Sequence, residues 1–176
     1  RIECEGVDDL VMLPKVTEES ILEMANSCFK PARRLRWHYR SRNSSLISFS
    51  NKHVYNDDLV IFPSAQEDHP DMGVSSVKVD GIYSSGVNPI EANVMVDAII
   101  NFMRTHKDKS LGVVLLNQKQ RDLLIDEMNF ALDQHLHTRK YIEKWEESKD
   151  GLESFFIKNL ENVQGDERDV IFIGTV

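Results

Sequence analysis

The most distinctive chemistry in the sequence is carried by a short cationic segment, residues 30–42. It holds six basic side chains and no acid: Lys30, Arg33, Arg34, Arg36, Arg40 and Arg42. Trp37 and Tyr39 are interleaved with them. Anionic nucleotides and nucleic-acid single strands require such a pattern, because phosphates pair with cations and bases stack on aromatic rings. A solvated basic edge would give the same pattern, so both interpretations stay open at this point.

Other familiar catalytic patterns do not occur in the sequence. It contains no G-x-x-x-x-G-K-[ST] phosphate loop and no G-x-S-x-G nucleophile elbow. Asp126 and Glu127 look like the acidic pair that binds magnesium in nucleotide-hydrolysing enzymes, but they lie in an amphipathic helical pattern and are expected to face solvent. His135 and His137 are two residues apart, which places them on different faces of a helix. No metal site is therefore predicted.

The composition is that of an ordinary globular protein. Of the 176 residues, 41% are apolar and 28% charged, and the net charge of −8 argues against a general nucleic-acid coat. No apolar run approaches the ~20 residues of a membrane span, and the start lacks a signal peptide. Two cysteines, Cys4 and Cys28, cannot form a disulfide scaffold, so a cytoplasmic location is predicted. Because the chain starts at Arg1 and stops on an apolar strand, we expect a fragment of a longer protein.

The first half of the chain is predicted to contain short elements. After a leading segment, residues 1–16, Thr17 caps a helix that runs to residue 29. The remaining elements follow from apolar spacing and turn residues: a short helix over 45–55, a strand over 59–62, a polar loop over 63–73 and a half-exposed strand over 76–79.

The second half has clearer signals. Asn88, Pro89 and Glu91 form a strong helix start, and this helix is predicted to run to about His106. Asn117 is predicted to cap a second helix to about His135. A continuous apolar run predicts a strand at residues 111–116, and two further strands are predicted at residues 154–158 and 169–174. Between the second helix and the second of these strands, residues 136–152 read as a charged, mobile insertion.

Strands that alternate with helices predict a mostly parallel sheet with right-handed crossovers. Ligands of such sheets bind beyond the carboxyl ends of the strands. Two polar segments follow predicted strands and are expected there. They are residues 39–41 and residues 161–168.

Three segments in order resemble superfamily 1 helicases of the Upf-like group. Residues 35–59, LRWHYRSRNSSLISFSNKHVYNDDL, resemble motif IV, commonly L-x-x-Q-Y-R-M-H-P followed by I-x-x-F-x-N-x-x-F-Y. Residues 158–173, KNLENVQGDERDVIFI, resemble motif V, with its V-D-x-x-Q-G-x-E-x-D-x-V-I core. Between them, residues 112–128 resemble the unit commonly reading G-V-I-T-P-Y-x-x-Q-x-x-x-I. The resemblance extends from about residue 17 to the end of the chain.

The resemblance implies a single domain over residues 1–176, the second RecA-like domain of a two-domain motor. Its fold is α/β and three-layered, of the P-loop NTPase type, with a mostly parallel sheet and helices on both faces. In the family, ATP and Mg²⁺ bind in the cleft between the two domains, and the first domain holds the phosphate loop and the magnesium acids. Motif VI is expected after residue 176.

The resemblance also assigns roles to individual residues. Arg40 matches the arginine finger, the catalytic group that reaches the γ-phosphate, and Tyr39 matches the neighbouring aromatic residue, which stacks on the base or packs in the core. Gly165, with a positive φ, and Glu167 are expected near the nucleotide. A further set is expected to contact nucleic acid: Asn117, Gln118 or Gln120, Asn162 and Gln164.

These assignments predict part of an ATP-dependent helicase, inactive in isolation, that contacts single-stranded DNA or RNA and the first RecA-like domain of its parent, with no membrane partner. Two alternatives remain. One is a RecA-like module that binds nucleic acid or protein without catalysis. The other is the helicase-like part of a restriction or repair nuclease, although the sequence shows no clustered nuclease carboxylates.

Overall fold

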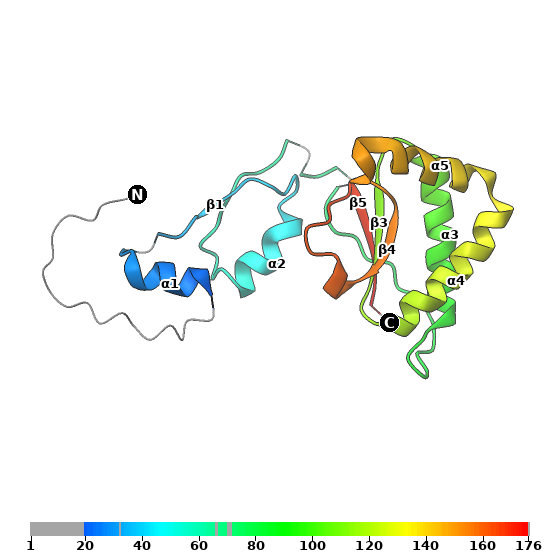
Figure 1. Cartoon of the computed structure of the whole chain (residues 1–176), viewed down its shortest axis with the longest axis horizontal. Coiled ribbons are helices and arrows are strands. Elements are labelled where there is room, and N and C mark those ends of the chain that lie inside the picture. The colour runs from blue at the N-terminus through cyan, green and yellow to red at the C-terminus, as the bar shows by residue number, and fades with distance from the viewer. Residues whose placement is uncertain (1–19, 32, 66, 70–71, 176) are drawn as a thin grey trace, which may run out of the picture. The chain divides into compact units, whose positions relative to one another are not determined.

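The computed structural model describes residues 20–31, 33–65, 67–69 and 72–175 of the chain. The chain divides into two compact units, Arg1–Ser75 and Ser76–Val176, here called unit 1 and unit 2. The predicted leading segment and the predicted cap Thr17 lie outside the described residues. Each unit has its own parallel sheet, and each is described separately below (Figure 1).

Unit 1 contains two short helices and a two-stranded sheet. Helix α1, Ile21–Cys28, begins after Ser20, whose hydroxyl accepts the Glu23 amide at 3.2 Å. Helix α2, Ser45–His53, lies within the predicted segment 45–55. Strands β1, Trp37–His38, and β2, Val60–Ile61, pair in parallel with Trp37 opposite Val60.

Two asparagines and a glutamate hold unit 1 together. The Asn43 side chain donates to the Glu67 carbonyl at 2.9 Å and accepts the Ser45 amide at 3.0 Å. The Glu67 carboxylate in turn accepts the Ser44 amide at 2.7 Å. Asn51 on α2 accepts the Leu59 amide at 3.0 Å and donates to the carbonyl of the same residue at 3.4 Å. Polar side chains therefore tie the long connection after α2 to the helix itself.

Unit 2 is built on three parallel strands in the order β4-β3-β5. Strand β3 is Leu111–Leu115, β4 is Phe156–Asn159 and β5 is Val170–Gly174. At the carboxyl ends, Leu115 lies opposite Asn159 on one side and Gly174 on the other. The middle strand β3 is buried along its whole length, as its continuous apolar run predicted.

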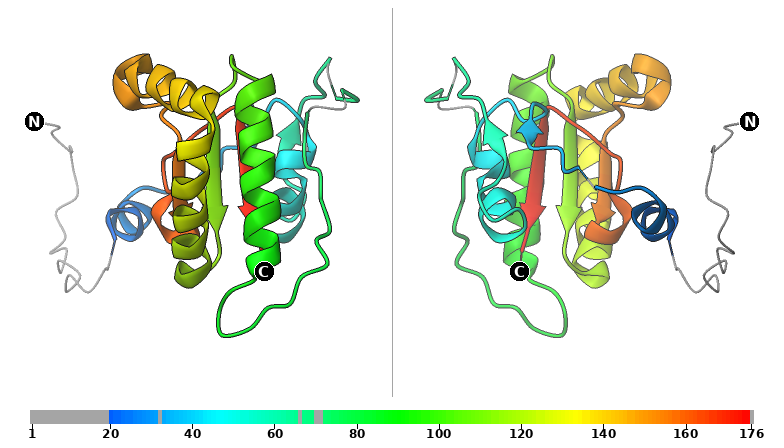
Figure 2. Two further views of the ribbon diagram at one scale, coloured as in Figure 1. Left: turned by 90° about the vertical axis from the view of Figure 1, so that its right-hand side faces the viewer. Right: turned by 90° about the vertical axis from the view of Figure 1, so that its left-hand side faces the viewer.

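Three helices pack on one face of this sheet (Figure 2). They are α3, Pro89–Thr105; α4, Gln118–Gln134; and α5, Leu136–Glu147. The predicted caps of α3 and α4 are confirmed, because Asn88 accepts the Glu91 amide and Asn117 accepts the Gln120 amide. In β5 exposure alternates: Val170 and Phe172 pack on the core, whereas Ile171 and Ile173 are exposed.

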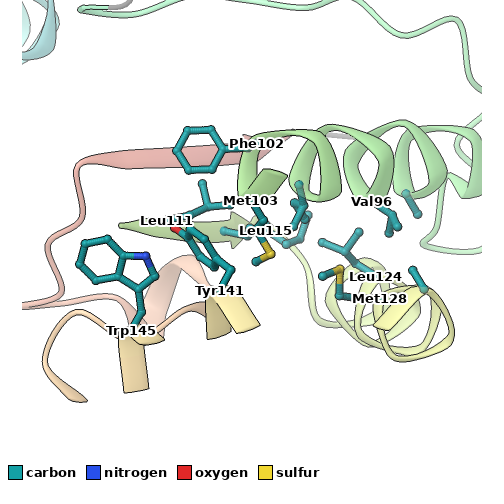
Figure 3. Packing of buried hydrophobic residues seen from close by; sticks show 13 residues of the cluster. Val96, Phe102, Met103, Leu111, Leu115, Leu124, Met128, Tyr141 and Trp145 are labelled. Atoms are coloured by element: carbon teal, nitrogen blue, oxygen red, sulfur yellow. The ribbon is translucent and has the colours of Figure 1, made fainter. Parts of the chain in front are cut away.

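The core of unit 2 lies between the sheet and these helices (Figure 3). Ile99 and Met103 of α3, Leu111 of β3 and Leu124 of α4 are completely buried. The 3.6-residue repeat of α3 and α4 places their apolar side chains on the face that meets the strands. This mixed α/β arrangement with a parallel sheet confirms the predicted α/β, RecA-like fold class, although α3, α4 and α5 cover one face of the unit 2 sheet rather than both.

Two sequence predictions are wrong in their local structure. Residues 76–79 form no strand; Val77 is 82% exposed, and no described strand pairs with this segment. Residues 136–152 are not a mobile insertion, because they form α5 and the 3-10 turn η1, Ser148–Gly151. Tyr141 and Trp145 of α5 are buried at helical spacing, and the Tyr141 hydroxyl donates to the Lys109 carbonyl at 2.5 Å. The charges of this segment had obscured its apolar stripe.

Candidate functional site

The carboxyl edge of the unit 2 sheet gathers part of the predicted site. Asn117 and Gln118 follow the end of β3 after one intervening residue. Asn162 ends the 3-10 turn η2, Leu160–Asn162, that follows β4. Because β3 and β4 are neighbouring parallel strands, these side chains come from adjacent strand ends. Gln118 and Asn162 are exposed, which leaves both amides accessible to a ligand. The Asn117 oxygen, in contrast, is used as the cap of α4.

Gln120 is buried, whereas a residue that contacts nucleic acid is expected to be exposed. Its side chain is 1% exposed. Its oxygen accepts the Asn88 amide at 2.7 Å, and its nitrogen donates to the Asn88 carbonyl at 3.0 Å. Gln120 therefore ties the start of α4 to the start of α3, and the expectation that it reaches nucleic acid is wrong because the side chain is buried.

The segment that resembles motif V, residues 158–173, begins in the last two residues of β4 and then forms a tight turn. Gly165 has φ of +90°, which confirms the predicted positive φ. A Cβ at this position would meet no atom within 4 Å, so backbone conformation rather than space favours glycine here. The Asp166 amide donates to the Val163 carbonyl at 3.0 Å, and the Asp166 carboxylate pairs with Lys158 of β4 at 2.6 Å. Asp166, which has no role in the resemblance, thus fastens the turn to the strand.

The second part of this segment lies at the opposite edge of the sheet. Arg168 donates to the Ser154 carbonyl before β4 at 2.8 Å, and its guanidinium lies over the Phe156 ring. Asp169 accepts both the amide and the hydroxyl of Ser110 at 2.9 Å, immediately before β3. The expectation that residues 161–168 lie wholly at the carboxyl edge is therefore wrong for Glu167 and Arg168. A connection between parallel strands must return to the amino edge before the next strand begins.

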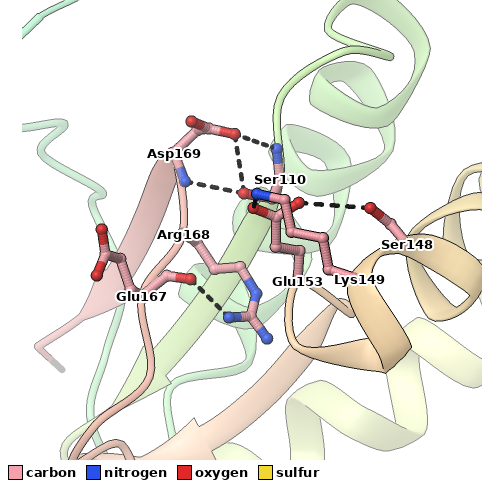
Figure 4. A network of polar contacts seen from close by, with 7 residues as sticks. All are labelled: Ser110, Ser148, Lys149, Glu153, Glu167, Arg168 and Asp169. Carbon is pink, nitrogen blue, oxygen red and sulfur yellow. Dashed lines mark hydrogen bonds and ion pairs between the residues drawn. The ribbon is translucent and has the colours of Figure 1, made fainter.

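A polar network occupies this amino edge (Figure 4). Lys149 pairs with Glu153, and its hydrogen bond to the Glu153 carboxylate is the main reason that the pKa of Lys149 is raised. The charges of Asp169 and Glu167 contribute in the same direction. Lys149 and Asp150 both have left-handed backbone conformations, with φ of 45° and 56°. The bond from Arg168 to the Ser154 carbonyl ties the segment after this turn to the start of β5, which is a structural role.

An open depression of about 680 Å³ adjoins the start of α4. Six residues line it: Tyr83, Ser85, Gly86, Asn117, Gln118 and Lys119. Two of them belong to the predicted nucleic-acid set, and the other four were not identified from the sequence. The sequence offered one signal for this depression, the Ser85-Gly86 pair, which is a common turn dipeptide.

Tyr39 and Arg40 belong to unit 1, whereas the other predicted site residues belong to unit 2. Both follow β1 at its carboxyl end, as expected, and Tyr39 is 93% exposed. The turn after β1 is fixed by the His38 ring, whose Nε2 lies 2.8 Å from the Ser41 hydroxyl and 3.1 Å from the Ser41 amide. Tyr39 is therefore a surface residue within unit 1 and does not pack in a core there.

The described residues offer cations and amides rather than metal ligands. Within residues 20–175, apart from the four positions that the structure does not describe, no three His, Cys, Asp or Glu side chains are placed to hold a metal ion. In the same described part, no helix is long and apolar enough to cross a membrane. Arginine and amide groups are donors suited to phosphate oxygens.

Comparison with known proteins identifies the family of the chain. Over 144 residues, 78% of the chain, it is 37% identical to an uncharacterized ATP-dependent helicase of Mycoplasma genitalium and 35% identical to the homologous protein of Mycoplasma pneumoniae. The matched region is 12% of the length of each of these relatives. No solved structure matches the chain. The family described as AAA domain matches residues 17–176, and the chain therefore belongs to this AAA domain family.

Proposed function

We propose that the chain is the second RecA-like domain of a superfamily 1, Upf-like, ATP-dependent helicase. The observation that carries the proposal is the turn after β4, where Gly165 of the Q-G-x-E sequence takes φ of +90° between two parallel strands. Membership of the AAA domain family and similarity to proteins named as ATP-dependent helicases support it. The activity belongs to the longer parent protein, of which this chain supplies one part.

In this proposal ATP and Mg²⁺ are held mainly by the first RecA-like domain of the same parent. Arg40 places a planar guanidinium against the phosphoryl oxygens, where negative charge spreads in the transition state. Tyr39 stacks on the base, for which its exposed ring is suited. Gly165 allows the turn to approach the nucleotide. The position of Glu167 near the amino edge does not support a contact with a nucleotide held at the carboxyl edge.

Single-stranded DNA or RNA is the proposed track. Gln118, Asn162 and Gln164 are exposed on or after the ends of adjacent strands, where amides can bond to phosphate and sugar oxygens. Such contacts carry little base information, so binding is expected to be nearly independent of sequence. The net charge of −8 opposes nonspecific binding, so we expect this chain alone to bind a single strand weakly.

The test is ATP hydrolysis by the full-length parent, with and without a single strand. The proposal expects hydrolysis that the strand accelerates, and no turnover by the isolated 176-residue chain, which has no phosphate loop. Gln164→Ala should reduce the acceleration more than the basal rate, because this residue would couple the strand to the nucleotide. Gln134→Ala, at the exposed end of α4, is the matched control.

Turnover by the purified isolated chain would contradict the proposal that it is half of a site. A parent that binds a strand tightly but does not hydrolyse ATP would instead identify a binding module.

A further inference from the structure

The depression at the start of α4 has walls that the fold keeps in place. One wall is a hairpin turn in which Ser84 and Val87 exchange two backbone hydrogen bonds, at 2.9 and 3.1 Å. Ser85 and Gly86 at its tip have φ of +56° and +94°, the conformation of a tight two-residue hairpin. The second wall is the first turn of α4, which carries Lys119.

The two walls are joined by direct contacts. The Lys119 ammonium donates to the Ser85 carbonyl at 3.2 Å. A Cβ on Gly86 would lie 2.8 Å from the Lys119 side chain, so a larger residue would push the lysine away. Immediately behind the hairpin, the buried pair of hydrogen bonds between Gln120 and Asn88 joins α4 to α3. These contacts hold the hairpin against the first turn of α4.

The lining has a chemistry that is unusual for this protein. Although the chain has 29 acidic residues, none of them lines the depression. One cation, one aromatic ring and two amide side chains do. The Tyr83 side chain is 54% exposed, so its ring is accessible for stacking. Lys119 uses one of its three hydrogen-bond donors on Ser85, which leaves donors for an anion.

We propose that this depression holds one nucleotide unit of a single strand, with the base on the Tyr83 ring and the following phosphate on Lys119. A single lysine matches the single charge of a phosphodiester, whereas a free triphosphate would require more positive charge. The depression also includes Asn117 and Gln118, so it is continuous with the carboxyl edge. The inference rests on the proposed function, since it adds a contact to the same nucleic-acid track.

The first experiment is amide NMR of the ¹⁵N-labelled 176-residue chain, titrated with a short oligothymidylate and, separately, with thymidine monophosphate. The oligonucleotide should shift the amide signals of Tyr83, Ser85, Gly86 and Lys119. Thymidine monophosphate should shift them far less at equal concentration, because it lacks the neighbouring units with which the oligonucleotide would also contact the carboxyl edge. Equal affinity for the two ligands would overturn the inference and indicate a site for a free nucleotide.

Two variants then separate stacking from charge. Tyr83→Leu should raise the Kd for the oligonucleotide about tenfold, while Tyr83→Phe keeps the affinity. Lys119→Gln should lower the slope of log affinity against log salt by about 0.7, the contribution of one phosphate contact in a single strand. Lys119→Arg should restore that slope. Phe130→Leu and Lys140→Gln, at exposed positions of α4 and α5, are controls that should leave binding unchanged.

The outcomes distinguish this inference from the proposed function. Wild-type binding by Tyr83→Leu, or shifts confined to Asn162 and Gln164, would overturn the subsite and leave the helicase proposal standing. If no amide signal shifts on addition of the oligonucleotide, while a single strand still accelerates ATP hydrolysis by the parent, the subsite is overturned and the helicase proposal stands. If a single strand does not accelerate ATP hydrolysis by the wild-type parent, the proposed function itself is overturned.

Discussion

In unit 2, apolar side chains from three helices and the sheet bury one another, whereas in the described part of unit 1 the two buried side chains are both asparagines. Large apolar residues of unit 1, among them Trp37 and Phe49, are exposed. Burial of apolar surface is the main stabilising force in folding, and hydrogen bonds add little net free energy. Unit 2 therefore has an apolar core of its own, while the described part of unit 1 depends on polar contacts.

The largest expected effect tests the core of unit 2. Leu124→Ala should lower the free energy of unfolding of unit 2 by about 2–5 kcal/mol, because it removes buried methyl groups and leaves a cavity. Amide hydrogen exchange of β3 measures this value separately from unit 1. Phe130→Ala on the same helix, where the ring is 66% exposed, should change it by less than about 0.5 kcal/mol. Equal losses in the two variants would contradict the location of the core.

The next effect concerns the polar contacts of unit 1. Asn51→Ala leaves the amide and carbonyl of Leu59 without their partner and should destabilise unit 1 by about 1–3 kcal/mol. We expect amide hydrogen exchange at Leu59 to become faster in this variant, while amide exchange in β3 stays unchanged. Lys52→Ala, at the neighbouring exposed position, serves as control. If Asn51→Ala has no effect, unit 1 does not depend on this asparagine.

A smaller effect is expected at the turn after β4. Gly165→Ala should cost about 1 kcal/mol, since an L-residue with a side chain is strained at positive φ although space is available. The Asp166 amide closes the turn, so the rate of its hydrogen exchange measures the loss of stability. Gly165→Asn should cost less, because asparagine tolerates this conformation better. A fully tolerated alanine would mean that the turn adopts another conformation.

The smallest effect is a dependence of unit 1 on pH. Hydrogen bonds from Ser44 and Ser64 hold the pKa of Glu67 below its usual value. A carboxyl whose pKa is lower in the folded state stabilises that state above its unfolded pKa. This contribution is lost as the pH falls through the folded pKa. Unit 1 should therefore open more readily in acid, and Glu67→Gln should remove that part of the pH dependence. The carboxyl NMR signal of Glu67 reports the pKa directly.

Much of unit 2 could be predicted from the sequence because its signals are local. The Asn88-Pro89 helix start and the apolar run of β3 act within a few residues, and both are found where expected. The role of Gln120 could not be predicted, since it depends on a contact 32 residues away. The same holds for Asp169, which binds Ser110 across the sheet.

The site was predicted less completely than the fold. Motif spacing correctly predicts positive φ at Gly165 but not that the chain has returned to the amino edge by Arg168. That return depends on the strand order β4-β3-β5, which no local pattern contains. The depression beside α4 depends on a hairpin and a helix brought together in space, so Tyr83 and Lys119 had no sequence signal as a pair.

The proposed role of Arg40 in the ATP site of a helicase is tested most directly by the kcat of ATP hydrolysis by the parent carrying Arg40→Ala. The account predicts a loss on the order of 10³-fold, with a much smaller change in nucleotide affinity. Arg40→Lys should also fail, because an ammonium cannot replace the planar guanidinium. Arg42→Ala, in the same cationic segment, should hydrolyse ATP normally. Normal hydrolysis by Arg40→Ala would contradict the claim and leave Arg40 as part of a solvated basic surface.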